Sequence, residues 1–195
     1  MSKLMISLLA AAGIAFAGAA NAAGNGTMSR DAYKADKDRI EAQYKADKAH
    51  CATLTGNAKD VCKAEAKGKE KVAKADLEAD YKNSDKARYD ARVAKADAAY
   101  DVAKEKCDDL SGNQKDVCVK QAKATHTKAK ADAKVAEVDS KTTRVAVNKR
   151  AEAHQDARED TRDAQYKVAI EKCDAMSGAA KDRCVKDAKA HYGKM

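Results

Sequence analysis

The chain has 195 residues, with 39 Lys and Arg, 31 Asp and Glu, no proline and no tryptophan. After residue 22 only 17 of 173 residues are Leu, Ile, Val or Phe, about a tenth, which is too few for a large globular core. Charges of both signs are interleaved with abundant Ala and Lys, which is typical of long helices rather than of disorder and argues against an enzyme with a deep pocket.

The first residues have the organisation of a secretory signal peptide. A basic start is followed by an apolar run and then by Ala20-Asn21-Ala22. The run is rich in Ala and Gly and falls short of the roughly 20 strongly apolar residues that span a bilayer, so a retained anchor is the weaker interpretation. We predict a signal peptide over 1–22 and a flexible N-terminus over 23–28. The mature protein is then periplasmic or secreted, with no membrane span.

An internal repeat follows. Three segments align without gaps, each with ten residues between two cysteines, and a tyrosine stands seven residues before the first cysteine every time. Such a repeat marks structural units. The segments are CATLTGNAKDVC from Cys51, CDDLSGNQKDVC from Cys107 and CDAMSGAAKDRC from Cys173. The predicted units are hairpin repeats over 29–83, 84–139 and 140–195.

Each repeat is expected to be a helix, a tight turn and a returning helix, so the fold class is all-α. Gly56, Gly112 and Gly178 suit the left-handed residue that ends a helix. Asn57 and Asn113 are expected to cap the returning helices, with the acids Asp60 and Asp116 three residues further on. The predicted helices cover 29–55, 57–82, 85–111, 113–139, 141–177 and 179–192. They form either one elongated antiparallel bundle or three hairpins in a row.

The cysteines lie five residues before and six residues after each glycine. At 1.5 Å rise per residue, the two cysteines of a repeat come to nearly the same height on antiparallel helices. Exported chains meet an oxidising compartment in which such thiols pair. One of the 15 possible pairings is therefore predicted. It joins Cys51 to Cys62, Cys107 to Cys118, and Cys173 to Cys184.

A stripe of heptad spacing leads into the second hairpin, with apolar residues at alternating steps of four and three. It places the disulfide on the buried face of a coiled-coil-like seam. The stripe consists of Tyr89, Val93, Ala96, Tyr100, Ala103, Cys107 and Leu110. The repeated tyrosines Tyr44, Tyr100 and Tyr166 are expected to pack in this seam rather than to stack a ligand. The first copy is weaker because Asp47 stands where the others have alanine.

No chemistry-bearing constellation recurs in the three copies. Redox cysteines favour a spacing of two residues at a helix start, whereas here ten residues intervene. A metal site would want Cys and His at ligand spacing, yet the four histidines share no common offset and are expected to face solvent. They are His50, His126, His154 and His191. We therefore expect no catalytic residue, no metal and no cofactor.

Lys59-Asp60 and its two equivalents recur at the turns, but helix capping already accounts for the acids. Nucleic acid is disfavoured because acids nearly balance the bases and no base-stacking motif appears. An envelope protein or an anionic envelope component is the more accessible partner for an exported chain, and oligomerisation is possible.

The signal peptide, the Ala/Lys/Asp-rich helices and the turn LSGN-x-KDVC resemble a family of uncharacterised secreted proteobacterial proteins loosely labelled TolA-like. The resemblance implies export and an extended helical fold, and it brings no established activity. We expect neither the membrane anchor of TolA nor its globular C-terminal domain, so a role in energy transduction is not implied.

The sequence favours a non-enzymatic structural, spacer or interaction protein of the cell envelope. The alternatives are a chaperone-like periplasmic holdase and a metal-binding periplasmic protein. An exposed apolar face would favour the holdase, whereas a uniformly charged surface favours the spacer.

Overall fold

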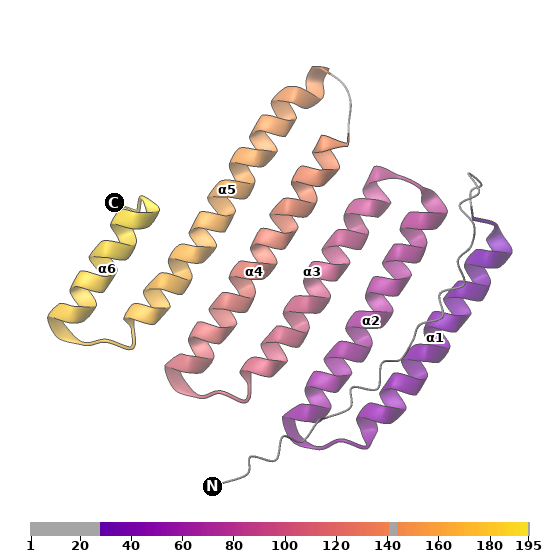
Figure 1. The fold of residues 1–195 in the computed structure, drawn as a ribbon, viewed down its shortest axis with the longest axis horizontal. Helices are drawn as coiled ribbons and strands as arrows, with labels where there is room; N and C mark the ends of the chain where they lie inside the picture. Colours follow the sequence, from indigo (N-terminus) through magenta and orange to yellow (C-terminus); the bar gives the residue numbers. More distant parts are fainter. Residues whose placement is uncertain (1–27, 141–143, 195) are drawn as a thin grey trace, which may run out of the picture.

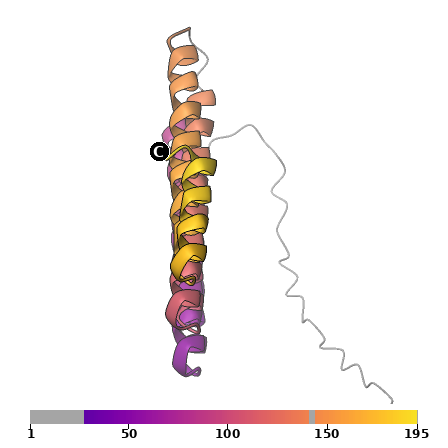
Figure 2. The ribbon, with the colours of Figure 1, turned by 90° about the vertical axis from the view of Figure 1, so that its left-hand side faces the viewer.

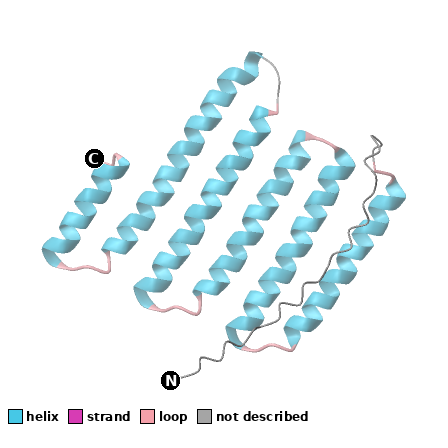
Figure 3. Ribbon diagram, in the orientation of Figure 1, coloured by secondary structure: helices cyan, strands magenta, loops and turns pink. Residues whose placement is uncertain are grey.

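The structure of the chain is a computed structural model that describes residues 28–140 and 144–194. The predicted signal peptide and nearly all of the predicted flexible N-terminus lie outside these residues. The described part is helical, with no strand (Figure 3). Its helices are α1 (Arg30–Ala52), α2 (Gly56–Lys82), α3 (Asp85–Cys107), α4 (Gly112–Asp139), α5 (Arg144–Cys173) and α6 (Gly178–Tyr192). None of these helices is long and apolar enough to cross a membrane.

The six helices lie side by side in a single layer, each antiparallel to the next (Figure 1). Viewed along the layer, they fall within one narrow column (Figure 2). Within the described residues, each helix contacts only the helices that precede and follow it in the sequence. Of the two expected arrangements, the structure therefore has the hairpins in a row. Helices α1 and α6 form the two edges of the layer.

A helix inside a layer must bury two opposite sides, and the sequence of α2 does so with small residues. Ala66 and Gly68 are both buried although they are only two residues apart, which places them about 200° apart around the helix. Gly68 packs so closely on α3 that a Cβ atom built there would lie 3.0 Å from the Cβ of Ala98. Other buried pairs of this kind are Leu77 and Ala79, Ala96 and Ala98, and Ala131 and Ala133.

Buried residues on one side of a helix recur every 11 residues. Examples are Ala66 with Leu77 in α2 and Ala96 with Cys107 in α3. Eleven residues make three turns at 3.67 residues per turn, which is close to the natural repeat of a helix, so the seam runs nearly straight along it. Straight seams on opposite sides allow consecutive helices to stay in one plane. The two broad faces of the layer are left for charged side chains.

The predicted heptad stripe lies on the side of α3 that faces α4, except for its last member, Leu110, which lies beyond the end of α3 and is exposed rather than buried. Its cysteine bridges to α4, and Tyr89 lies under Lys134 of α4, with the Nζ atom 5.6 Å from the ring centre. The opposite side of α3 packs on α2 through a second alanine stripe that the sequence reading did not identify. Ala87 and Ala91 belong to that stripe and form a buried cluster with Ala79 of α2.

The first helix of each hairpin ends three or four residues earlier than predicted. The N–H groups of Leu54, Leu110 and Met176 donate to the carbonyl oxygen of the cysteine three residues earlier, at 3.2, 3.0 and 2.9 Å. This tight last turn satisfies carbonyl groups that a longer helix would otherwise use. The helices therefore stop at Ala52, Cys107 and Cys173.

The turn glycines have the left-handed conformation that the sequence predicted, but they begin the returning helix instead of ending the first. Gly56, Gly112 and Gly178 have φ values of 58°, 54° and 54°. The N-cap position before each glycine holds a serine or a threonine whose side chain makes no capping hydrogen bond. The prediction that Asn57 and Asn113 cap these helices is wrong, because both lie inside the helix and have another partner.

Candidate interaction surfaces

All three predicted disulfides are confirmed. They join Cys51 to Cys62, Cys107 to Cys118 and Cys173 to Cys184, with Cα–Cα distances of 5.4, 5.7 and 5.6 Å. The first cysteine of each pair is at most 1% exposed. We call the disulfide-bearing end of a hairpin its tip, comprising residues 51–62, 107–118 and 173–184. No cysteine is free, so no thiolate is present to act as a nucleophile or metal ligand in this state.

The two asparagines join neighbouring hairpins. The Nδ2 atom of Asn57 donates to the backbone carbonyl of Glu105 at 2.9 Å, and Asn113 makes the same bond to Glu171 at 3.0 Å. Both acceptors stand two residues before the first cysteine of the following repeat. These bonds therefore fix the tips of the first and second hairpins against the hairpin that follows each of them. A signal was present in the sequence: asparagine recurs in two copies, whereas the last copy has Ala179.

Charged residues at the tips mostly pair within their own hairpin. Lys115 lies 3.0 Å from Asp108, and Lys181 lies 3.0 Å from Asp174, in each case across the turn. The first copy has Ala52 where the others have this aspartate. Two of the three repeated lysines therefore hold the turn closed instead of presenting a free cation to a partner.

The three repeated tyrosines are half-buried and lie on three different helices. Tyr100 stacks on His126 of α4 with ring centres 4.8 Å apart. Tyr166 meets Tyr192 edge to face at 6.1 Å. Tyr44 instead lies under Lys48 of its own helix, with the Nζ atom 5.3 Å from the ring centre. Tyr100 and Tyr166 therefore each contact the second helix of their own hairpin, Tyr166 at the last residue of that helix.

The histidines do not gather around a common point. His126 was predicted to face solvent, but it is half-buried, and its Nε2 atom lies 2.6 Å from Oδ1 of Asp97. Burial against Tyr100 and α3 accounts for the difference. His154 lies 3.7 Å from Asp139, while His50 and His191 are exposed. Over residues 28–140 and 144–194, no cluster of three or more His, Cys, Asp or Glu is placed to hold a metal ion.

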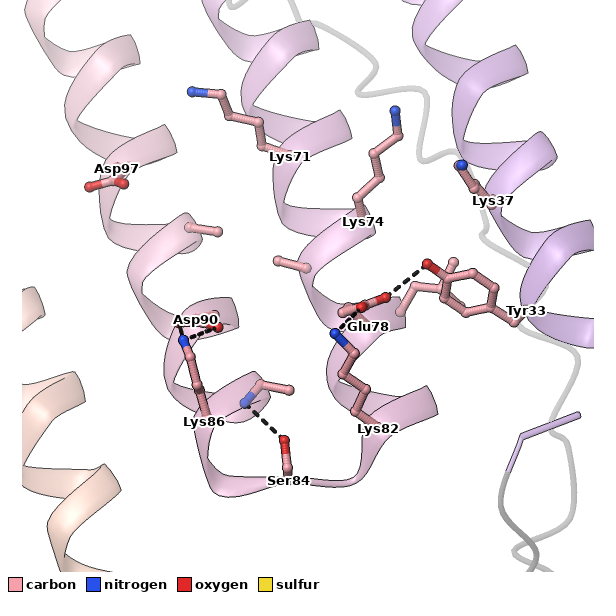
Figure 4. Close-up of a pocket in the computed structure, with 14 residues that line it drawn as sticks. Tyr33, Lys37, Lys71, Lys74, Glu78, Lys82, Ser84, Lys86, Asp90 and Asp97 are labelled. Carbon is pink, nitrogen blue, oxygen red and sulfur yellow. Dashed lines mark hydrogen bonds and ion pairs between the residues drawn. The ribbon is translucent and has the colours of Figure 1, made fainter. Parts of the chain in front are cut away.

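A shallow groove of about 680 Å³ crosses α1, α2 and α3 on one broad face (Figure 4). Lysines line much of it, but carboxylates accompany them. Glu78 lies 2.5 Å from Nζ of Lys82 and accepts a 2.8 Å hydrogen bond from the hydroxyl of Tyr33. Lys86 pairs with Asp90 at 2.8 Å. The groove therefore offers little uncompensated charge to an ionic ligand.

The pKa shifts in this groove follow from the same contacts. The hydrogen bond from Lys82, and then the one from Tyr33, lowers the pKa of Glu78. The bond to Glu78 in turn raises the pKa of Lys82 and of Tyr33. Each of these shifts moves the pKa of the group further from neutral pH, whereas a general acid or base needs a pKa near the working pH. The cluster is consequently suited to holding α1 against α2 and not to proton transfer.

Ion pairs between helices cross both broad faces. Lys71 of α2 pairs with Asp101 of α3 at 3.9 Å, and Lys95 of α3 pairs with Asp76 of α2 at 2.8 Å. Further pairs are Lys74 with Glu41, Lys106 with Glu65, Lys120 with Glu171, Arg150 with Asp139, and Lys194 with Asp163. The paired side chains are partly exposed, so each pair contributes at most about 1 kcal/mol. Collectively they offset charge along neighbouring helices.

Large apolar side chains do not form a patch on the described surface. The exposed ones are Tyr81, Leu110, Val147 and Met176, which lie in α2, at the second tip, in α5 and at the third tip. Residues spaced in this way are ordinary for a protein surface.

No protein-family model, curated protein or solved structure matches this chain.

Proposed function

We propose that this chain is a non-enzymatic, exported helical protein that serves as a flat structural or spacer unit of the cell envelope, periplasmic or secreted. The single layer of disulfide-pinned hairpins supports this proposal most directly. A layer one helix thick has two broad faces and little interior, so it can separate or connect components but has no room for an enclosed substrate.

Export is supported by two independent features. The N-terminal sequence has the pattern of a signal peptide, and all six cysteines are paired in disulfides of the kind that persist in an oxidising compartment. The likeness to secreted TolA-labelled proteins agrees with this compartment. The proposed partner is an envelope protein or an anionic envelope component rather than nucleic acid, because acids nearly balance bases along the chain and ion pairs between the described helices offset part of the positive charge.

The alternatives have less support. A holdase needs an apolar surface for unfolded clients, yet the exposed apolar side chains are scattered over the described surface. A metal-binding role would need thiolates or grouped histidines, but the cysteines are bridged and His50 and His191 lie at distant exposed positions.

Photo-crosslinking in intact cells tests the spacer role. A photoreactive residue in place of Lys67, on a broad face, should give adducts with one or a few envelope components. Mass spectrometry of the same protein should find an N-terminus near Ala23. Uncleaved protein in the cytoplasm would refute export. Suppression of client aggregation at near-stoichiometric protein would replace the spacer with the holdase.

A further inference from the structure

Neighbouring hairpins are joined through four equivalent positions on the second helix of a hairpin, the helix whose asparagine donates a hydrogen bond to the next hairpin. In α2 and α4 these positions are buried or half-buried and fall on one side of the helix. This side faces the next hairpin, since Asn57 and Gly68 contact α3 and Asn113 contacts α5. The residues at the four positions are Asn57, Val61, Ala64 and Gly68 in α2, and Asn113, Val117, Lys120 and Ala124 in α4. Each set combines an amide that reaches the next helix, a valine and a small residue at the closest approach.

Helix α6 departs from α4 at the first two of these four positions and matches it at the last two. Its residues there are Ala179, Arg183, Lys186 and Ala190, and all four are exposed. Ala179 has no amide to donate to a neighbouring carbonyl. Arg183 places a charge where the inner hairpins have valine, and burying it without a partner would be costly. The outer side of α6 therefore lacks the features with which α2 and α4 bind their neighbours.

The outer side of α1 has changed in a complementary way. Inside the layer, Glu171 receives the amide of Asn113 through its carbonyl, and its carboxylate lies 3.6 Å from Nζ of Lys120. The residue in α1 that is equivalent to Glu171 is Ala49. If α6 of a neighbouring copy packed on α1, its Lys186, which is equivalent to Lys120, would therefore meet no carboxylate at this position.

We infer that the two outer helices close the array, so that the protein is a finite unit of three hairpins and does not extend head to tail with further copies. Terminal repeats with altered outer faces are what a repeat protein needs to remain finite. The edges keep the small residues of the seam: Ala42 and Ala190 are exposed, whereas the equivalent residues inside the layer are buried or half-buried. Closure thus depends on the lost amide, the added charge and the lost carboxylate. Because closure of the array is a property of hairpin packing, an experiment can refute closure without refuting the proposed envelope role, and the reverse.

Opening the edges by substitution tests this inference. The variant Ala49→Glu/Ala179→Asn/Arg183→Val reproduces on α6 and α1 the residues by which α4 binds α5, and it retains Lys186. All the changed residues are exposed in the native protein, and circular dichroism would verify that helix content is kept. In sedimentation velocity of the oxidised protein, its mean mass should rise with concentration, whereas the wild type should stay at the monomer mass.

A control with the same charge changes on a broad face separates edge pairing from general charge effects. Arg92→Val/Ala99→Glu changes two exposed residues of α3 and should remain monomeric. Three results would overturn the inference: a wild type that associates through its edges, an opened variant that stays monomeric at every concentration, or a control that associates as strongly as the opened variant.

Discussion

The hydrogen bonds of Asn57 and Asn113 are the smallest features that hold one hairpin to the next. Replacing Asn57 by alanine removes the amide that reaches Glu105. We expect the free energy of unfolding to fall by about 1 kcal/mol, the usual net contribution of such a bond. Asn113→Ala should behave alike. Denaturant titration measures both, and the exposed Asn148→Ala serves as the control. Variants of Asn57 and Asn113 as stable as that control would show that the amides do not link the hairpins.

Glu78 gives the stability a dependence on pH. Its pKa is lowered in the folded state by Lys82 and Tyr33, so its stabilising effect is complete above the pKa of the unfolded chain, about 4.3. The effect is lost as the pH falls through the folded pKa. Because the side chain is 36% exposed, solvent screening keeps the effect on the order of a few tenths of a kcal/mol.

Thermal melts of Glu78→Gln and the wild type should therefore differ slightly at pH 7 and converge only as the pH falls below the lowered pKa that Glu78 has in the folded state. The exposed Glu159→Gln is the matched control and should show no such convergence. A difference between Glu78→Gln and wild type that persists undiminished in acid would mean that the substitution acts by packing rather than by charge.

At the scale of the helix, the close approach of α2 to α3 depends on Gly68. A branched side chain there would collide with Ala98, because even a Cβ atom would lie 3.0 Å from that residue's Cβ. We expect Gly68→Val to cost about 1–3 kcal/mol of stability, as overpacking usually does. The exposed Lys67→Val should cost much less. The exchange Gly68→Ala/Ala98→Gly keeps one methyl group at the contact and should fold with near-native stability. A native-like Gly68→Val would contradict the tight contact.

The disulfides stabilise helices whose seams consist largely of alanine. Each bridge closes a loop between cysteines 11 residues apart, which restricts the unfolded chain by about 3 kcal/mol. Removing one bridge with Cys107→Ser/Cys118→Ser should lower the melting temperature markedly. Much of the helical signal at low temperature should remain because Ala, Lys and Glu favour helix locally. Calorimetry and circular dichroism with and without reductant would reveal this. Melting that is indifferent to reduction would show that packing alone suffices.

Sequence reasoning could predict the hairpins because their signals are local. A repeated glycine with cysteines at matched distances determines both the turn and the pairing. The second seam was missed because a heptad pattern describes only one side of a helix. The available signal was a pair of small residues flanking one charged residue, such as Ala66 and Gly68 or Ala96 and Ala98. In such a pair the two residues face opposite directions. The asparagine bonds were missed because an asparagine beside a helix start is normally interpreted as a cap.

On the scale of the whole molecule, the two-sided burial of the inner helices determines the shape. A bundle would bring sequence-distant helices together, whereas here contacts within the described residues follow chain order alone. The result is a plate about 10–12 Å thick. Its stability comes from many small contributions along the chain, and the closure of its edges keeps it from growing.

The separation of α1 and α6 tests the single layer most directly. Spin labels can be placed at the exposed positions Gln43 and Asp187 by introducing a residue that is labelled without a thiol. This chemistry leaves the three disulfides intact. Five steps of 8–10 Å between neighbouring helices place these labels about 40–50 Å apart or more. Labels at Gln43 and Lys69, on adjacent helices, provide the short reference of about 10 Å. Pulsed electron–electron double resonance should find the distance of about 40–50 Å or more between the labels at Gln43 and Asp187. A distance below about 20 Å between α1 and α6, as in a closed bundle, would contradict the layer.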